Sequence, residues 1–176
     1  MGSRMKWILW IFVVLAGILI LVTLIGYALP KEHTVTREAR FHQSPGVIWK
    51  TITDVDTMPS WRQGLKSVQR LPDKNGLPAW VETTDSGIIP YETVASQPPS
   101  KLVVRIADPK LPFGGMWTYE ITSLPSGTNL RIREDGEIYN PIFRFLSRFV
   151  IGYNGTIETY LKSMARKFGE QPQLGN

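Results

Sequence analysis

The sequence predicts an α+β protein in which a membrane-crossing helix precedes one domain, an antiparallel sheet of about seven strands packed on a long C-terminal helix. Three observations predict this fold class. Residues 7–29 contain no charge, residues 66–138 alternate between apolar and polar side chains in six short segments, and residues 141–168 carry apolar side chains at helical spacing. Successive strands with no helix between them are typical of sheets built from consecutive hairpins.

The uncharged run at residues 7–29 is long enough to be a transmembrane helix. At about 1.5 Å per residue it would extend roughly 34 Å, which crosses the hydrocarbon core of a bilayer with modest tilt. A cleaved signal peptide is the alternative, because Gly26 and Ala28 are small enough for a cleavage site. Signal-peptide cores are only about 7–15 residues long, however. We therefore expect residues 1–30 to be an uncleaved membrane anchor.

Basic residues at the two ends of the run bear on its orientation. Arg4 and Lys6 precede it, whereas Lys31, Arg37 and Arg40 lie on the far flank. Lys and Arg close to a span favour the cytoplasmic side. We expect a single-pass membrane protein with its N-terminus inside and its soluble domain extracytoplasmic.

The rest of the chain has the size of one compact domain. We expect residues 31–170 to form this domain and residues 171–176 to be a disordered tail. The sequence has 20 basic and 15 acidic residues, a net charge of +5, and no cysteine. The absence of cysteine excludes disulfides and thiolate chemistry. Basic and acidic residues are interspersed rather than gathered into a basic stripe, so no nucleic-acid partner is predicted.

A strand and a short helix open the domain. Residues 33–41 alternate with the period of a half-buried strand. Ser44 can cap a helix, Pro45 suits its first position, and apolar residues recur at helical spacing until Pro59. The six strands that follow are separated by stretches rich in Pro, Gly, Asp or Ser. We place them at residues 66–71, 79–84, 88–95, 102–107, 116–122 and 129–138.

A long amphipathic helix closes the domain. Asn140 is a suitable N-cap, and Pro141 fits the first helical position. An apolar stripe then continues at steps of three and four as far as Phe168. Asn154 and Gly155 interrupt the pattern, and we expect them either to kink the helix or to split it.

This order of elements resembles the helix-grip fold, in which a curved sheet wraps around the final helix. The stretch SPGVIWKTITDVDTMPSWR at 44–62 is similar to the opening signature of the SRPBCC superfamily, which includes START-like and polyketide cyclase/dehydrase-like domains. LPFGGMWTYEIT at 111–122, LRIREDGEI at 130–138 and NPIFRFLSRFV at 140–150 are similar to segments of its membrane-anchored bacterial members. The resemblance covers about residues 31–169. It implies a hydrophobic-ligand cavity between sheet and helix, but not one particular reaction.

Large side chains on the inward faces of the strands and the last helix are candidates to line such a cavity. Simple packing of the core is the alternative for each of them, and it is the ordinary explanation for most. Aromatic rings would suit a flat or acyl ligand. The candidate ligand-binding residues are Trp80, Tyr91, Ile106, Trp117, Tyr119, Ile132, Glu134, Phe145, Phe149 and Tyr153.

The period of two also places two charged residues, Arg37 and Glu134, on the inward face. We hypothesise that they form an ion pair beside the cavity, since an isolated buried charge costs several kcal/mol. A purely structural bridge is the alternative. Glu82 and Glu92 are further candidates, although solvent exposure explains these carboxylates equally well. Arg62 could contact an acidic head group, but a surface cation packed on the neighbouring tryptophan is the simpler explanation.

Metal-dependent and nucleophilic chemistry have little support in the sequence. The only histidines, His33 and His42, are nine positions apart on or near one strand, so they lie on opposite faces. Without cysteine, and without a histidine placed to activate a serine, no metal site and no cofactor are predicted.

Three hypotheses on function follow. The first is a membrane-anchored domain that binds a hydrophobic small molecule, such as a lipid or an isoprenoid. The second is a cyclase-like or dehydratase-like acid–base enzyme that uses Glu134 with Arg37 or Tyr119. The third is an interaction module with a filled core, in which Arg144 and Arg148 contact anionic lipids or an acidic protein. The expected partners are thus a hydrophobic ligand and the lipid bilayer, with any protein partner left unspecified.

Overall fold

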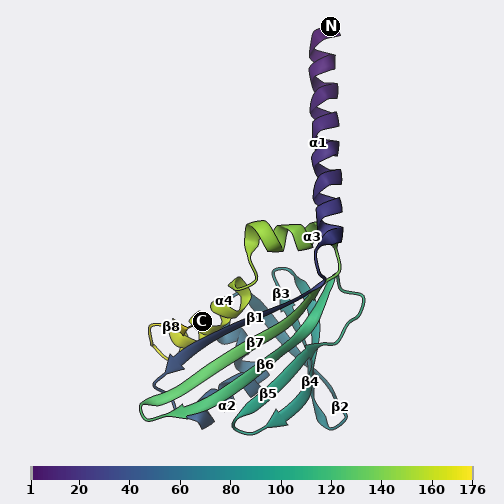
Figure 1. Cartoon of the computed structure of the whole chain (residues 1–176). Helices are drawn as coiled ribbons and strands as arrows, with labels where there is room; N and C mark the ends of the chain where they lie inside the picture. The colour runs from purple at the N-terminus through teal and green to yellow at the C-terminus, as the bar shows by residue number, and fades with distance from the viewer. Residues whose placement is uncertain (1, 176) are drawn as a thin grey trace.

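The structure, a computed structural model, describes residues 2–175 and has the α+β architecture that the sequence predicts. Figure 1 shows the long helix α1 (Gly2–Ala28) standing away from a domain in which helices pack against a curved sheet. Over residues 6–28, α1 is long and apolar enough to cross a membrane, and its large side chains are exposed along its length.

The element bounds agree with the predicted pattern to within a few residues, and most strands are longer than expected. The strands are β1 (Glu32–Phe41), β2 (Leu65–Lys74), β3 (Leu77–Thr84), β4 (Gly87–Gln97), β5 (Lys101–Ile106), β6 (Phe113–Leu124), β7 (Gly127–Ile138) and β8 (Gln173–Gly175). The remaining elements are α2 (Pro45–Thr53), the 3-10 helix η1 (Val55–Ser60), α3 (Pro141–Leu146), the π-helical segment η2 (Ser147–Ile151) and α4 (Gly155–Lys167).

The sheet is antiparallel throughout, with the order β2-β3-β4-β5-β6-β7-β1-β8. Six consecutive strands pair as hairpins, and β1 then pairs with β7 along its whole length. This is the predicted helix-grip topology. The expected disordered tail is wrong for Gln173–Gly175, which pair with residues 38–40 of β1 as strand β8.

The core lies where α4 packs on the inner face of the sheet. Ile157, Leu161 and Met164 on α4 are fully buried, as are Leu130 and Ile132 on β7. Burying one such side chain contributes about 1.5–3 kcal/mol. The helix is therefore held by its apolar stripe, at the end of the sheet that includes β7 and β1.

The predicted long C-terminal helix is split into two parts. Asn140 caps α3 as expected, because its side chain accepts hydrogen bonds from the backbone N–H groups of Ile142 and Phe143. The helix then widens into η2 and stops at Gly152, whose φ of +79° lies in the left-handed region that favours glycine. The chain restarts as α4 at Gly155, so the break begins before the predicted Asn154–Gly155 position.

The end of α1 packs against the start of α3. Gly26 is buried so close to the carbonyl of Pro141 that a Cβ at this position would overlap it. The guanidinium of Arg144 donates a hydrogen bond of 2.9 Å to the carbonyl of Leu29 and lies over the ring of Tyr27. Arg144 is only 4% exposed, so the expectation that it meets lipids or a partner from an open helix face is wrong.

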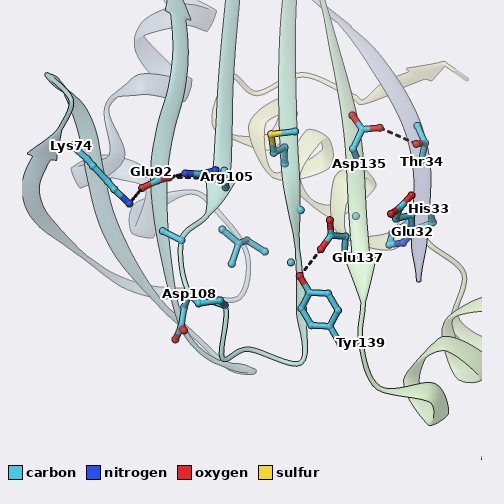
Figure 2. Close-up of a pocket in the computed structure, with 17 residues that line it drawn as sticks. Glu32, His33, Thr34, Lys74, Glu92, Arg105, Asp108, Asp135, Glu137 and Tyr139 are labelled. Atoms are coloured by element: carbon cyan, nitrogen blue, oxygen red, sulfur yellow. Dashed lines mark hydrogen bonds and ion pairs between the residues drawn. The ribbon is translucent and has the colours of Figure 1, made fainter. Parts of the chain in front are cut away.

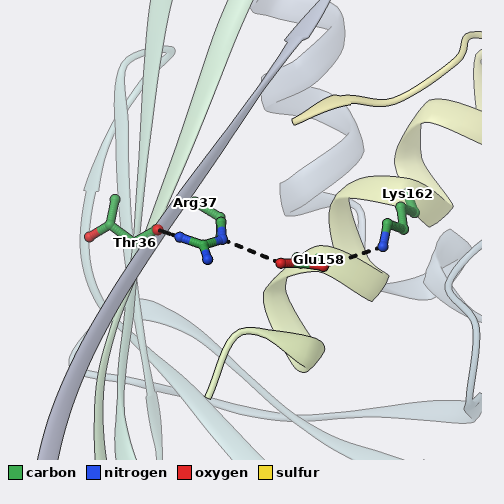
Figure 3. A network of polar contacts seen from close by, with 4 residues as sticks. All are labelled: Thr36, Arg37, Glu158 and Lys162. Atoms are coloured by element: carbon green, nitrogen blue, oxygen red, sulfur yellow. Dashed lines mark hydrogen bonds and ion pairs between the residues drawn. The ribbon is translucent and has the colours of Figure 1, made fainter. Parts of the chain in front are cut away.

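The predicted ion pair between Arg37 and Glu134 is also wrong, although both residues do lie on the inward face. Figure 3 shows that Arg37 turns to α4 instead, where its Nε lies 3.3 Å from an oxygen of Glu158. Lys162 donates to the other oxygen of that carboxylate. Because α4 covers this part of β1, Glu158 is available to Arg37, whereas Glu134 contacts His33.

We predict a pH-dependent loss of stability in Glu158→Gln. Burial pushes the pKa of Glu158 upward, but hydrogen bonds from Lys162 and Arg37 outweigh it and hold this pKa below its ordinary value. The carboxylate therefore stabilises the fold above the unfolded-state pKa of about 4.3 and loses this contribution as the pH falls. Near neutral pH the variant should lose about 0.5–1 kcal/mol, or roughly 2–4 °C in Tm at most.

Circular dichroism of the detergent-solubilised chain during heating measures this Tm. The difference in Tm between wild type and Glu158→Gln should become smaller as the pH is lowered. Glu32→Gln, at an exposed position with no ion-pair partner within the described residues, should show no such trend. A difference in Tm for Glu158→Gln that stays constant with pH would contradict the stabilising role of the ionised Glu158 carboxylate.

Candidate functional site

A cavity of about 780 Å³ lies between the inner face of the sheet and the C-terminal helical segments. Strands β3 to β7, with His33 of β1, supply one wall, and α3, η2 and the start of α4 supply another. Ile52, Met58 and residues 62–65 complete the lining. Several lining residues are exposed, among them Ser86, Phe143 and Gly152, so the cavity opens to the outside between the β3–β4 turn and the helical segments. The third hypothesis, an interaction module, requires a filled core, and this part of the structure contains a cavity instead.

Most of the predicted ligand-binding residues come together in this cavity. Those that line it are Trp80, Tyr91, Ile106, Trp117, Tyr119, Glu134 and Tyr153. Six of them lie on strands, where the period of two sends their side chains to the inner face, and Trp80 stacks on Tyr91 there at a centroid distance of 5.7 Å. Tyr153 lies at the break between η2 and α4.

Three predicted lining residues are placed elsewhere. Ile132 points inward but is fully buried beneath α4, so it packs the core. Phe145 and Phe149 pack on each other at 5.0 Å, and neither lines the cavity. Phe149 is 61% exposed. Both rings belong to the part of the helical run before the break at Gly152, so the packing of α4 on the sheet does not carry them inward.

The cavity has a polar end built from Arg62 and Glu82. The Arg62 guanidinium Nη1 donates to Glu82 Oε1 at 2.7 Å, and the indole N–H of Trp80 donates to the same oxygen at 3.1 Å. Glu82 is only 2% exposed, which contradicts the solvent-exposed alternative. Arg62 is no surface cation either, because its side chain is mostly buried and lies over the ring of Tyr160.

Burial and charge shift the pKa values of this polar end. Burial lowers the pKa of Arg62, but Glu82 together with Tyr119, Tyr91 and Tyr160 outweighs burial, so the net shift is upward and the guanidinium stays charged. Burial, reinforced by Glu82, raises the pKa of Tyr91 to about 12. Burial, with Tyr160 next to it, also raises the pKa of Tyr119 well above its ordinary value. Both phenols therefore stay neutral near pH 7 and can donate hydrogen bonds.

Two carboxylate oxygens on the cavity wall have no hydrogen-bond partner within the described residues. They are Glu82 Oε2 and Glu134 Oε2, and both are buried. A buried acceptor left unpaired costs about 1–3 kcal/mol or more. Both residues line the cavity, so a small shift of either side chain would present its free oxygen to a molecule inside.

His33 is a cavity residue that the sequence-based reasoning missed. Its Nε2 lies 3.5 Å from Glu134 Oε1, and its ring stacks on Tyr153 at 4.1 Å. The alternation along β1 contains the signal for this residue, because His33 and Arg37 are four positions apart and therefore lie on the same, inward face. An imidazole beside a carboxylate is a combination that can transfer protons.

A second hollow, of about 570 Å³, is built mainly on the opposite, outer face of the sheet. Figure 2 shows its polar lining, in which Glu92 lies between Lys74 and Arg105. Glu92 is only 4% exposed, so the solvent-exposed alternative is wrong for this carboxylate too. Hydrogen bonds from Lys74 and Arg105 hold its pKa below the ordinary value. These charges compensate one another, and the hollow offers far less apolar wall than the inner cavity.

Comparisons with known proteins agree with this geometry. A family described as "Polyketide cyclase / dehydrase and lipid transport" matches residues 32–169. No curated protein sequence matches the chain.

Solved structures share the fold at low sequence identity. A START superfamily protein from Mycobacterium smegmatis has 18% identity and a TM-score of 0.63, with 77% of this chain and 96% of that chain covered. Norcoclaurine synthase from Thalictrum flavum has 10% identity and a TM-score of 0.62, with 84% and 92% covered. The di-domain ARO/CYC StfQ from the steffimycin biosynthetic pathway has 16% identity and a TM-score of 0.58; the match covers 78% of this chain but only 52% of StfQ.

We predict that Arg62→Met destabilises the domain strongly. The substitution leaves the buried Glu82 carboxylate without its cation, which typically costs about 3–5 kcal/mol, and Arg62→Met/Glu82→Gln should recover part of that loss. Arg70→Met is the matched control, because it breaks an exposed pair with Asp56 and should cost at most about 1 kcal/mol. Thermal unfolding of the solubilised variants measures all three. Equal effects of Arg62→Met and Arg70→Met would contradict a buried ion pair.

Proposed function

The chain belongs to the polyketide cyclase/dehydrase and lipid transport family, within the SRPBCC superfamily that its motifs resemble, and we propose on this basis that its cavity binds a hydrophobic small molecule of the lipid or isoprenoid class. The observation that carries the proposal is the cavity of about 780 Å³ between sheet and helices. Small-molecule sites typically enclose about 300–1,000 Å³. One acyl or polycyclic molecule fits this range.

The cavity walls support an apolar ligand with one polar end. Trp80, Tyr91 and Trp117 present aromatic faces, against which a flat or extended hydrocarbon packs well. The unpaired oxygen of Glu82 gives the ligand's polar end a hydrogen-bond acceptor next to Arg62. A ligand that carries a hydroxyl group would satisfy this oxygen, whereas a plain hydrocarbon would leave its cost uncompensated.

Membrane attachment through α1 is the second part of the proposal. The helix is long and apolar enough to cross a bilayer. Its last turn contacts the domain through Gly26 and Tyr27, and signal-peptide cleavage near Gly26–Ala28 would disrupt this contact. Arg4 and Lys6 lie within three residues of the apolar run, and of the basic residues on the far flank only Lys31 is as close. This difference favours a cytoplasmic N-terminus and an extracytoplasmic domain. Tethering keeps the cavity beside the membrane, where a sparingly soluble ligand is concentrated.

Acid–base catalysis on the bound molecule is a second candidate function, and the contact between His33 and Glu134 favours it. Arg37, which the sequence paired with Glu134, has no part in this version because it binds Glu158. Ligand binding and catalysis can be distinguished by whether the bound molecule is chemically changed. A catalyst converts its ligand to a product and loses this conversion in Glu134→Gln, whereas a carrier releases its ligand unchanged.

We predict that filling the cavity weakens ligand binding. Ile106→Trp places an indole in the cavity, so binding of a pyrene-labelled fatty acid should weaken by about tenfold or more, ~1.4 kcal/mol. Val103→Trp is the matched control, because Val103 lies on the same strand, outside the cavity lining and facing the other way. Fluorescence titration of the detergent-solubilised chain measures both. Wild-type affinity in Ile106→Trp, with the fold intact by circular dichroism, would rule this cavity out as the site.

We also predict that residues 1–30 remain attached and hold the chain in the membrane. After bacterial expression, the intact mass of the protein should include the α1 residues, and alkaline carbonate should not release it. Ile18→Arg/Ile20→Arg should be released, since each arginine at the centre of a span costs about 2.5–3.5 kcal/mol. A mature protein that begins near Leu29 would instead identify a signal peptide.

A further inference from the structure

Segment 141–151, which comprises α3 and η2, has an unusual surface that we call the apolar arm. Its exposed hydrophobic side chains are Phe143, Phe149, Val150 and Ile151, with exposed fractions between 52% and 71%. Apolar side chains surround most of this helical segment. A helix that is hydrophobic all round is normally covered on every side. The domain covers only one side of the arm, so the rest of its apolar surface needs another apolar environment.

The position of the arm points to the bilayer as that environment. Figure 1 shows α3 beginning at the end of α1 and running sideways from it, above the sheet. The Arg144 hydrogen bond to the Leu29 carbonyl and the Gly26–Pro141 contact hold it there. If α1 spans the membrane, as the proposed function requires, its apolar run ends at the membrane surface. The arm then lies at that surface, roughly parallel to it.

The charge of the arm fits a lipid surface. Residues 139–157 contain two arginines and no acidic residue. Arg144 is buried against α1, and Arg148 is exposed. An apolar helix with an exposed cation and no carboxylate is typical of interfacial membrane segments, which insert their apolar side chains among the lipids and keep the basic group at the head-group level.

The arm also borders the cavity. Phe143, Ser147 and Ile151 line it, followed by Gly152 and Tyr153 at the break between η2 and α4. These residues form the helical side of the cavity opening. A bilayer that covers the arm would therefore also adjoin the opening.

We propose that the apolar arm is an in-plane membrane contact that places the cavity opening against the bilayer. This inference rests on the proposed membrane attachment, and it deepens the proposed function by naming the route of the ligand. The hydrophobic molecule passes directly between bilayer and cavity along the arm, so its apolar surface does not cross water.

The lack of cysteine in the chain allows a direct test by single-site labelling. Val150→Cys and Val47→Cys, each in the full chain, are labelled with an environment-sensitive fluorophore and reconstituted into phosphatidylcholine–phosphatidylglycerol vesicles. Val47 is the matched control, because it is an exposed valine on α2, which lies at the end of the domain away from α1 in Figure 1. Quenching by doxyl-labelled lipid then reports contact with the bilayer.

The result expected is strong quenching and a blue-shifted emission at position 150, with neither effect at position 47. Equal, weak quenching at both positions would overturn the proposal. So would crosslinking of Val150→Cys to a second copy of the chain without quenching by lipid, because another protein would then cover the arm.

A transfer assay separates this inference from the proposed function. Phe149→Glu/Val150→Glu should slow transfer of a fluorescent lipid from vesicles to the chain by about tenfold or more, ~1.4 kcal/mol in the barrier, while uptake of that lipid in detergent stays as in wild type. Transfer at the wild-type rate would overturn the route. If the unmodified chain takes up no lipid even in detergent, the proposed cargo fails, and the quenching result still decides the membrane contact.

Discussion

The packing of α4 on one part of the curved sheet is the constraint on which the rest of the structure depends. Ile157, Leu161 and Met164 fill the space beside β7 and leave no room there for a ligand. Because the helical run breaks at Gly152, α4 is only 13 residues long. It does not reach the inner face around Trp80, Tyr91 and Ile106, and that uncovered region becomes the cavity. The same break separates α4 from α3 and η2, and the start of α3 packs on the end of α1.

The ion pairs of the domain are of two kinds: some join elements away from the inner cavity, and one lies at the cavity wall. Arg37 and Glu158 join the first strand to α4, and the charges around Glu92 compensate one another on the outer face. Arg62 and Glu82 differ because their pair is buried at the wall of the cavity and leaves one carboxylate oxygen unpaired. A buried ion pair is a weak source of net stability, so its position at the cavity is the more informative property. The family and the fold admit carriers as well as enzymes, and the polar end of the cavity suits both.

Local sequence patterns predict the helices and strands, whereas the partners of the charged residues depend on tertiary packing. The strands follow from alternation and the α3 cap from Asn140, because these signals depend on residues close in sequence. The partner of Arg37 could not be found this way, since Glu158 lies 121 positions later on another element. Glu82 looked like a surface carboxylate because β3 has no cleanly apolar face. Arg62 becomes its partner only when η1 folds over the sheet. Asn154 and Gly155 mark an interruption of the helix, but the apolar stripe on either side does not indicate that the chain already turns at Gly152.

The central claim is that a hydrophobic molecule occupies the space that α4 leaves uncovered. Its most direct test is to purify the full chain from its native membrane, to remove loosely bound lipid by exchange into detergent, and to identify by mass spectrometry the small molecules that remain. The account predicts one apolar, hydroxyl-bearing compound in near-stoichiometric amount, which should be lost when the cavity is blocked. A chain that carries no compound above the level of an unrelated single-pass protein, and acquires none from a membrane lipid extract, would contradict it.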